Sequence, residues 1–353
     1  MSRPFRWSIL GTGAVARKFV LDLAHLDEAE AHVVASRNPD NARTFANDLG
    51  ISQALSYDEA VTADVDAIYI ATPAALHEPQ ALAAIAAGKA VLIEKPMAGN
   101  AEAARRIAEA AKAANVFCME AMWPRFQPAI ETVLAKIQGG ALGEPIGFDA
   151  RFMAANQVET TASIFDPARD GGAMLHRGIY PLSLARLFLG PIADCQVLTR
   201  KGETGVDEDS LITLAHENGA LSSLRASLRA NGPDGTVIYG TKATIYLDGP
   251  VYRPLGVRLV PTYAAPNPAG PAPRRKLEGF RESRAGLRSM GTLKGLMGAV
   301  RKTRRLKADF KGNGYHYQAR AVMEAVRQGK TTEPRMMPEE SIELLALIDR
   351  ITQ

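Results

Sequence analysis

A glycine-rich turn near the N-terminus constrains the fold more than any other feature. An apolar run from Arg6 to Leu10 leads directly into Gly11-x-Gly13-x-x-Ala16, and an amphipathic stretch follows. This order is typical of a strand, a tight turn and a helix whose free N–H groups face a phosphate. Gly11 permits the turn, Gly13 lets the backbone approach a pyrophosphate, and Ala16 keeps helix and strand close. The sequence predicts a nucleotide-binding βαβ unit, although a tight turn without a ligand has the same pattern.

The next predicted strand bears on the choice of nucleotide. In an NAD site, an acidic residue about 20 positions beyond the glycines accepts a hydrogen bond from the ribose 2′-OH. This chain has Ser36 and Arg37 at that place, and no carboxylate. A hydroxyl and a guanidinium can bind a 2′-phosphate through charge-assisted hydrogen bonds. The sequence therefore favours NADP(H), with NAD(H) possible, unless Arg37 is only a solvated surface side chain.

Two further apolar runs end where open α/β sheets bind their ligands, at the carboxyl ends of parallel strands. One run covers residues 90–94 and stops at Lys95, because the proline that follows cannot continue a ladder. Lys95 either faces a ligand or merely caps its strand. The other run ends before Thr72 and Pro73, which could line the nicotinamide side together with His77. A surface position at the start of a helix is an equal alternative for His77.

The first third of the chain alternates between strand and helix patterns. Strands are predicted at 6–10, 31–36, 66–71, 90–94 and 116–120, and helices at 14–25, 39–49, 75–87 and 100–114. Such alternation is typical of βαβ units and a parallel sheet. We therefore expect a doubly wound dinucleotide-binding domain over residues 1–123.

The pattern changes in the remainder, which we assign to a second domain over residues 124–353. A helix is predicted at 173–188, with strands at 146–153, 193–200, 208–216, 220–229, 236–240, 243–248 and 257–260. Strands grouped in this way indicate an α+β domain with a mostly antiparallel sheet. Residues 313–353 are helical again. The fold class is thus α/β with a second, α+β domain.

A proline-rich and basic excursion at 250–311 interrupts the second domain. Residues 250–273 contain seven prolines, and residues 270–311 carry 13 Lys/Arg against three Asp/Glu, in a chain whose net charge is +4. Residues 285–307 could form a basic amphipathic helix, but Gly291, Gly295 and Gly298 weaken that prediction. We interpret the excursion as a solvated segment, and a flap or a subunit arm is the alternative. No recognition motif accompanies the charge, so specific nucleic-acid binding is not expected.

Length and composition are those of an intracellular protein of two domains. The chain has 353 residues, and no run approaches the roughly 18 apolar residues of a membrane span. The first strand begins too early to leave room for a signal peptide. Cys118 and Cys195 lie on apolar segments without zinc spacing, so we expect reduced thiols, no metal and a cytoplasmic location.

The second half holds one cluster that could perform chemistry, in residues 165–181. His176 and Tyr180 are four positions apart, so a helix places them on one face. A tyrosine can act as general acid if a nearby cation such as Lys95 lowers its pKa from about 10. The lysine could also hydrogen-bond the reacting oxygen. A buried helix face with a satisfied Tyr and His is the alternative.

Together these motifs resemble a known family. The glycine turn, Glu94-Lys95-Pro96 and Gly171-Gly172-Ala173-x-Leu175-x-x-Gly178-x-Tyr180 are similar to the Gfo/Idh/MocA oxidoreductases. Residues 120–126, 165–167 and 314–336 resemble the branch of dimeric dihydrodiol dehydrogenase, D-xylose dehydrogenase and glucose–fructose oxidoreductase. The resemblance covers residues 5–248 and 312–353.

The resemblance implies a Rossmann domain, C-terminal helices that pack back towards it, and an open sheet through which the chain forms a dimer or tetramer. It implies that Lys95 and Tyr180 are catalytic, with Tyr180 as general acid/base. The predicted substrate-binding residues are His176, Trp123, Arg125 and Arg177. The predicted cofactor-binding residues are Gly11, Thr12, Gly13, Ala14, Val15, Ser36, Arg37, Ala71, Thr72, Pro73, His77, Glu94 and Lys95.

These expectations combine into an NADP(H)-preferring oxidoreductase that transfers hydride between nicotinamide and a secondary alcohol or ketone of a sugar, polyol or cyclic diol. The family usually has Asp where this chain has His176. A histidine donates as well as accepts and titrates near neutral pH, so a substrate with an acidic group or altered chemistry could follow. The departure also supports an alternative, a catalytically idle NAD(P)-binding sensor or scaffold.

Overall fold

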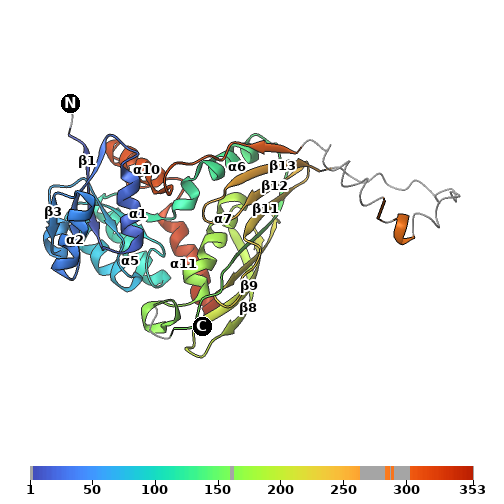
Figure 1. Ribbon diagram of the computed structural model, residues 1–353, viewed down its shortest axis with the longest axis horizontal. Helices are drawn as coiled ribbons and strands as arrows, with labels where there is room; N and C mark the ends of the chain where they lie inside the picture. The colour runs from blue at the N-terminus through green and yellow to red at the C-terminus, as the bar shows by residue number, and fades with distance from the viewer. Residues whose placement is uncertain (1–2, 160–162, 263–282, 287, 290–302, 353) are drawn as a thin grey trace.

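The computed structural model describes most of the chain as two domains side by side (Figure 1). Described are residues 3–159, 163–262, 283–286, 288–289 and 303–352. Residues 285–307, which could form a basic amphipathic helix, fall largely outside the described residues. The described ends of the excursion form strands at the edge of the second sheet.

The first domain is built on a six-stranded parallel sheet of order β3-β2-β1-β4-β5-β6. Its strands are β1 (Phe5–Leu10), β2 (Ala29–Ala35), β3 (Gln53–Leu55), β4 (Ala67–Ile70), β5 (Ala90–Glu94) and β6 (Cys118–Ala121). Its helices are α1 (Ala14–Leu23), α2 (Pro39–Leu49), α3 (Tyr57–Thr62), α4 (His77–Ala86) and α5 (Ala101–Ala114). Every element predicted here is present. The sequence patterns did not predict β3 and α3, which are too short to show a period.

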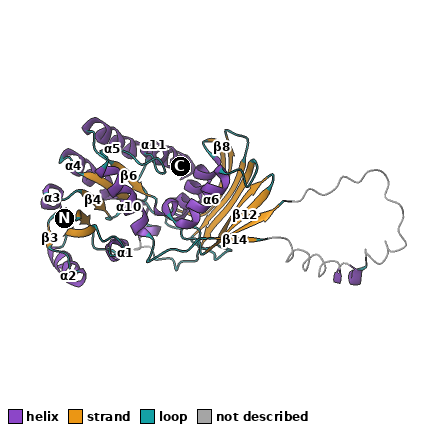
Figure 2. Ribbon diagram, turned by 90° about the horizontal axis from the view of Figure 1, so that it is seen from above, coloured by secondary structure: helices purple, strands orange, loops and turns teal. Residues whose placement is uncertain are grey.

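The second domain is an eight-stranded sheet of order β14-β13-β12-β11-β7-β10-β9-β8, in which only β7 and β10 pair in parallel. Its strands are β7 (Pro145–Met153), β8 (Ile192–Lys201), β9 (Asp207–His216), β10 (Leu221–Ser227), β11 (Gly235–Gly240), β12 (Ala243–Asp248), β13 (Gly256–Pro261) and β14 (Arg304–Leu306). The predicted fold class is confirmed. Figure 2 shows α6 (Pro128–Gln138), which was not predicted, on the side of the sheet that faces the first domain.

Helices fill the space between the two sheets. The helix predicted at 173–188 is a π-helical turn, η5 (Met174–Gly178), continued by α7 (Ile179–Leu189), which packs on β7. The last two helices return to the first domain: α10 (Tyr315–Arg327) packs on α1, and α11 (Pro338–Thr352) packs on α5 and α7 (Figure 1). The domains therefore meet along a helical layer, with the ends of β5 and β6 beside it.

Candidate active site

A first cavity, of about 580 Å³, lies at the carboxyl edge of the parallel sheet. Ten of the thirteen predicted cofactor-binding residues line it: Gly11, Thr12, Gly13, Ala14, Val15, Ser36, Arg37, Ala71, Thr72 and Pro73. Asn38, Asn41, Tyr57, Leu76 and Ser163 complete its wall. The structure thus gathers separate segments of the first domain around one space.

The glycine turn has the geometry that a dinucleotide requires. Gly11 has a φ of +114°, and a Cβ there would lie 2.6 Å from the Ala71 carbonyl oxygen, so the turn packs tightly on the end of β4. Gly13, by contrast, faces open space, because no atom lies within 4 Å of the place that a Cβ would take. It caps α1 without any side-chain hydrogen bond. The first N–H groups of α1 are therefore available to a phosphate, and these residues fit the pyrophosphate of NAD(P).

His77 and Glu94 lie behind this cavity and do not line it. Both ring nitrogens of buried His77 contact carbonyl oxygens, Nδ1 that of Pro96 at 2.9 Å and Nε2 that of Thr72 at 2.8 Å. Burial lowers the His77 pKa. Glu94 accepts a hydrogen bond from the Tyr69 hydroxyl, and burial raises the Glu94 pKa to about 7. Both side chains hold the loops at the ends of β4 and β5.

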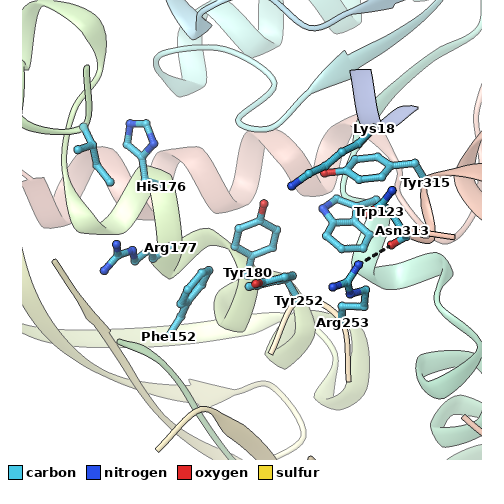
Figure 3. Close-up of a pocket in the computed structure, with 11 residues that line it drawn as sticks. Lys18, Trp123, Phe152, His176, Arg177, Tyr180, Tyr252, Arg253, Asn313 and Tyr315 are labelled. Atoms are coloured by element: carbon cyan, nitrogen blue, oxygen red, sulfur yellow. Dashed lines mark hydrogen bonds between the residues drawn. The ribbon is translucent and has the colours of Figure 1, made fainter. Parts of the chain in front are cut away.

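A second cavity, of about 330 Å³, lies between the domains and adjoins the first, since Ser163 lines one and Ile164 the other. Its wall is largely aromatic (Figure 3). Trp123 stacks on Tyr315 with ring centroids 4.7 Å apart, and Tyr252 lies 5.9 Å from the Tyr180 ring. The residues lining it are Lys18, Trp123, Phe152, Ile164, His176, Arg177, Tyr180, Tyr252, Arg253, Asn313 and Tyr315.

The paired glycines predicted to precede a helix place Tyr180 at this cavity. Gly172 has a φ of +125°, and a Cβ there would lie 2.1 Å from an oxygen of Asp207. That carboxylate accepts the Met174 N–H at 2.8 Å and so satisfies the start of η5. The turn and helix then carry His176 and Tyr180 to the cavity wall, with the Tyr180 hydroxyl pointing into the space (Figure 3).

Lys95 joins the two domains at this point. Its Nζ lies over the Tyr180 ring, 5.0 Å from the centroid, and donates a hydrogen bond to the His176 carbonyl oxygen at 3.3 Å. The expectation that a nearby cation would lower the Tyr180 pKa is wrong for this state of the protein. Burial raises that pKa, and the opposing effect of the Trp123 N–H, a donor to the phenol, is smaller. Tyr180 is therefore protonated at neutral pH.

His176 lines the cavity but does not titrate near neutral pH as its ordinary pKa predicts. Burial lowers the His176 pKa to about 4, and the charges of Lys95 and Arg177 act in the same direction. The imidazole is thus neutral over the physiological range. It can donate one hydrogen bond and accept another, but it supplies no positive charge for an acidic group.

The two predicted substrate-binding arginines occupy different environments. Arg177 lines the cavity, and its guanidinium donates to the carbonyl oxygens of Ala154 and Ser227 and to the Asn156 side chain. Arg125 is 0% exposed and does not reach the cavity. It donates to Ser183, the Arg335 carbonyl oxygen and Glu340, 2.7 Å from the last. Arg125 therefore joins α7 to the start of α11.

Several lining residues were not predicted as site residues. Tyr315 lies within a motif of the resemblance, and Lys18 lies two residues beyond the glycine motif, so both could have been proposed. Tyr252 and Arg253 follow β12 in the excursion, where no local pattern indicates a site. Only the folding of the sheet brings them to the cavity.

One group of side chains has the chemistry of metal ligands. Candidate ligand atoms of Asp22, His25 and His316 lie within 4.8 Å of one another. The Asp22 carboxylate, however, already accepts the backbone N–H groups of Asn313 and Tyr315 at 2.8 and 2.7 Å. These contacts satisfy the start of α10 and tie it to α1, which explains the buried carboxylate without an ion.

The assignment of the chain follows from family comparison. Residues 5–122 match the model of an oxidoreductase family with an NAD-binding Rossmann fold, and residues 130–246 match the GFO/IDH/MocA C-terminal domain. The chain belongs to the Gfo/Idh/MocA oxidoreductase family. This confirms the resemblance seen in the sequence. The protein is an NAD(P)-binding oxidoreductase, and nothing in the comparisons favours the idle alternative.

Curated members of this family that resemble the chain include trans-1,2-dihydrobenzene-1,2-diol dehydrogenases. The Mus musculus protein is 35% identical over 67% of this chain and 72% of its own length. The Homo sapiens protein is 32% identical over 70% of this chain and 76% of its own length. No helix among the described residues of this family member is long and apolar enough to cross a membrane.

Solved structures share the fold over nearly the whole chain. Levoglucosan dehydrogenase in complex with NADH has a TM-score of 0.80 at 20% identity, covering 99% of this chain and 95% of that one. A 3-ketoreductase from Actinomadura kijaniata in complex with NADP and TDP-benzene has a TM-score of 0.76 at 23% identity, covering 99% and 97%. At such identities these structures establish the fold alone.

Proposed function

We propose that the protein is an NADP(H)-preferring oxidoreductase acting on a secondary alcohol or ketone of a sugar, polyol or cyclic diol. The observation that carries the proposal is a protonated Tyr180, with Lys95 over its ring, in a cavity that adjoins the dinucleotide cavity. The names of the relatives support the substrate class, since they include dehydrogenases of a cyclic diol and of levoglucosan.

The residues around the second cavity divide the work of such a reaction. When bound, the nicotinamide supplies or accepts the hydride. Tyr180 holds a proton at its hydroxyl, which points into the cavity, and would donate it to the carbonyl oxygen in the reductive direction. The Lys95 ammonium would stabilise negative charge that develops on that oxygen. The aromatic wall offers flat surfaces to a ring-shaped substrate.

The preference for NADP(H) rests on the end of β2. Ser36 and Arg37 line the first cavity, and the lining residues that the structure describes include no carboxylate to accept from a ribose 2′-OH. Asn38 and Asn41 add neutral hydrogen-bonding groups beside them. A 2′-phosphate would therefore meet a guanidinium and amides, without an opposing negative charge.

We also propose that the protein forms a homo-oligomer through the outer face of the second sheet. Leu198 on β8 is 75% exposed and lies directly opposite Leu211 on β9, and Leu221 on β10 is 63% exposed. Neighbouring apolar side chains exposed on a sheet face favour association with another surface. Sedimentation velocity tests the proposed oligomer, because a monomer at micromolar concentration would contradict it.

We further propose a cytoplasmic location. The free thiols of Cys118 and Cys195 suit a reducing compartment.

Tyr180→Phe tests the reaction directly. Loss of a general acid costs about 10²–10⁴-fold in turnover, so we expect NADPH to bind normally while turnover falls by at least about 100-fold. Tyr246→Phe is a matched control, because the Tyr246 ring packs under Arg258 on the second sheet, away from the cavity. A panel of aldoses, inositols and dihydrodiols supplies the substrates. Full turnover by a folded Tyr180→Phe enzyme would refute the assignment.

A further inference from the structure

The second cavity carries an excess of positive charge. Three cationic side chains line it, those of Lys18, Arg177 and Arg253, and Lys95 lies beside Tyr180. No Asp or Glu is among the lining residues in the part of the chain that the structure describes. Such a cavity favours an anionic ligand over a neutral one, because the low-dielectric wall strengthens the attraction.

Three acidic residues near the cavity, Glu94, Glu120 and Asp22, do not line it. Glu94 and Glu120 are buried behind Lys95, and burial raises the pKa of each. Asp22 lies behind Tyr315, where its carboxylate accepts two backbone N–H groups. Asp22 remains ionised, because its hydrogen bonds outweigh burial and lower its pKa, but its carboxylate is directed at the start of α10. None of the described ion pairs involves Lys18, Arg177 or Arg253.

The cations differ in whether their donors are free. The terminal nitrogens of Arg177 are occupied by Ala154, Ser227 and Asn156, so this residue contributes charge and few open donors. The Arg253 guanidinium lies over the Phe310 ring, 5.2 Å from its centroid, and makes one long hydrogen bond, at 3.5 Å, to the Asn313 carbonyl oxygen. Its buried Nε has no hydrogen-bond partner among the described residues. The guanidinium therefore brings donors without close protein acceptors to the cavity wall, and a ligand oxygen can accept from them.

Lys18 completes this open pair. It comes from α1, is exposed, and has no hydrogen bond or ion pair to other described residues. In Figure 3, Lys18 and Arg253 lie on the Trp123 and Tyr315 side of Tyr180, whereas His176 and Arg177 lie on the other side. The two cations with unused donors therefore lie at the same end of the cavity.

We infer that the substrate carries an anionic group, a carboxylate or a phosphate ester, which Arg253 and Lys18 bind while the reacting carbon lies at Tyr180. A guanidinium matches the two oxygens of either group. The inference rests on the proposed function for the hydride step and adds a separate claim about charge. His176 agrees with it, because a carboxylate at that position would bring negative charge into the cavity.

Matched substrates test the inference. D-glucose would be compared with D-glucuronate and D-glucose 6-phosphate, and myo-inositol with its 1-phosphate, by the initial rate of NADP⁺ reduction and by calorimetry on the NADP⁺-loaded enzyme. We expect at least one anionic member to exceed its neutral congener by about tenfold or more in kcat/KM and in affinity, with the advantage shrinking as salt rises. Comparison of D-glucuronate with the two phosphate esters distinguishes a site for a carboxylate from a site for a phosphate.

Variants locate the effect. Arg253→Gln should bring the ratio of anionic to neutral substrate close to one, and exposed Lys18→Gln should reduce it by a smaller factor, with NADPH affinity within twofold of wild type. Arg258→Gln is the control, because Arg258 pairs with Asp248 outside this cavity. An unchanged ratio in Arg253→Gln would overturn the inference. So would a loss of NADPH affinity alone in both variants, which would assign these cations to the cofactor.

The two levels of the proposal fail separately. If the NADP⁺-loaded enzyme binds an anionic member through Arg253 but oxidises nothing in the panel, the proposed reaction fails and the anion site stands. If neutral members are turned over as well as their anionic congeners, the reaction stands and the anion site fails. If no anionic member binds, the inference is rejected.

Discussion

The Lys95 ammonium lies 5.0 Å from the centroid of the Tyr180 ring, over its face. The two residues come from different domains, one from the end of β5 and the other from the first turn of α7. The ammonium also donates to the His176 carbonyl oxygen. The reacting groups are thus held together by a contact across the domain boundary, and the site exists only when the domains are docked.

Alanine at the two glycines of the turn should affect different properties, stability at Gly11 and NADPH affinity at Gly13. Gly11→Ala places a Cβ 2.6 Å from the Ala71 carbonyl oxygen at a positive φ, and we expect a loss of roughly 2–4 kcal/mol in unfolding free energy. Gly13→Ala meets no atom within 4 Å, so stability should change by less than about 1 kcal/mol. NADPH affinity should nevertheless fall by at least tenfold. Chemical denaturation and fluorescence titration measure the two effects, and unaltered NADPH binding by Gly13→Ala would contradict the pyrophosphate site.

Arg37→Asp should reverse the cofactor preference. The new carboxylate would repel a 2′-phosphate and could accept from a ribose 2′-OH, so the Kd for NADPH should rise by tenfold or more while that for NADH stays level or falls. Arg43→Asp is the control, because it makes the same change of charge in the exposed Arg43–Asp40 pair on α2, outside the lining of the first cavity. An equal effect in both variants would contradict a contact between Arg37 and the phosphate.

Glu94 should make stability depend on pH. Its folded pKa of about 7 lies above the ordinary 4.5, so the folded state binds the proton more tightly. The penalty for ionising this buried group is absent below about pH 4.5 and complete above about pH 7. Relative to Glu94→Gln, the wild type should therefore lose about 3 kcal/mol of unfolding free energy between pH 4.5 and pH 8. Urea denaturation of both proteins at several pH values measures this, and a constant difference would count against a raised pKa.

His176 should remain neutral throughout the working range. Its pKa of about 4 predicts no step from this imidazole in kcat/KM between pH 5.5 and 8. Its ring proton resonances should likewise stay level over that range in NMR spectra. The neutral variant His176→Asn identifies the resonance. A transition near pH 6.5 that disappears in the variant would show that the imidazole is not desolvated.

Arg125→Met should reduce stability and leave substrate binding intact. The change leaves the partly buried Glu340 carboxylate without its cation, and breaking a buried pair costs about 3–5 kcal/mol. At temperatures where the variant is folded, KM should match that of the wild type, because Arg125 does not line the cavity. A raised KM with unchanged unfolding free energy would return Arg125 to the substrate site.

Local patterns in the sequence were sufficient for the framework. The glycine turn, the alternation of strands and helices and the ends of β4 and β5 are each encoded within a few consecutive residues, because turn chemistry and strand or helix period act locally. The pairing of Lys95 with Tyr180 could also be proposed, since motifs of known relatives carry both residues. The parallel sheet followed from the same short-range signals.

Only the tertiary structure decided the chemical state of the site. Arg125 belongs to the interior and Arg253 to the cavity because distant segments pack around them, and no local pattern reports that packing. Desolvation lowers the His176 pKa and raises the Tyr180 pKa, and it depends on everything that surrounds a side chain. The sequence by itself thus determined which residues could act, whereas the fold decided which of them face the cavity and which carry charge.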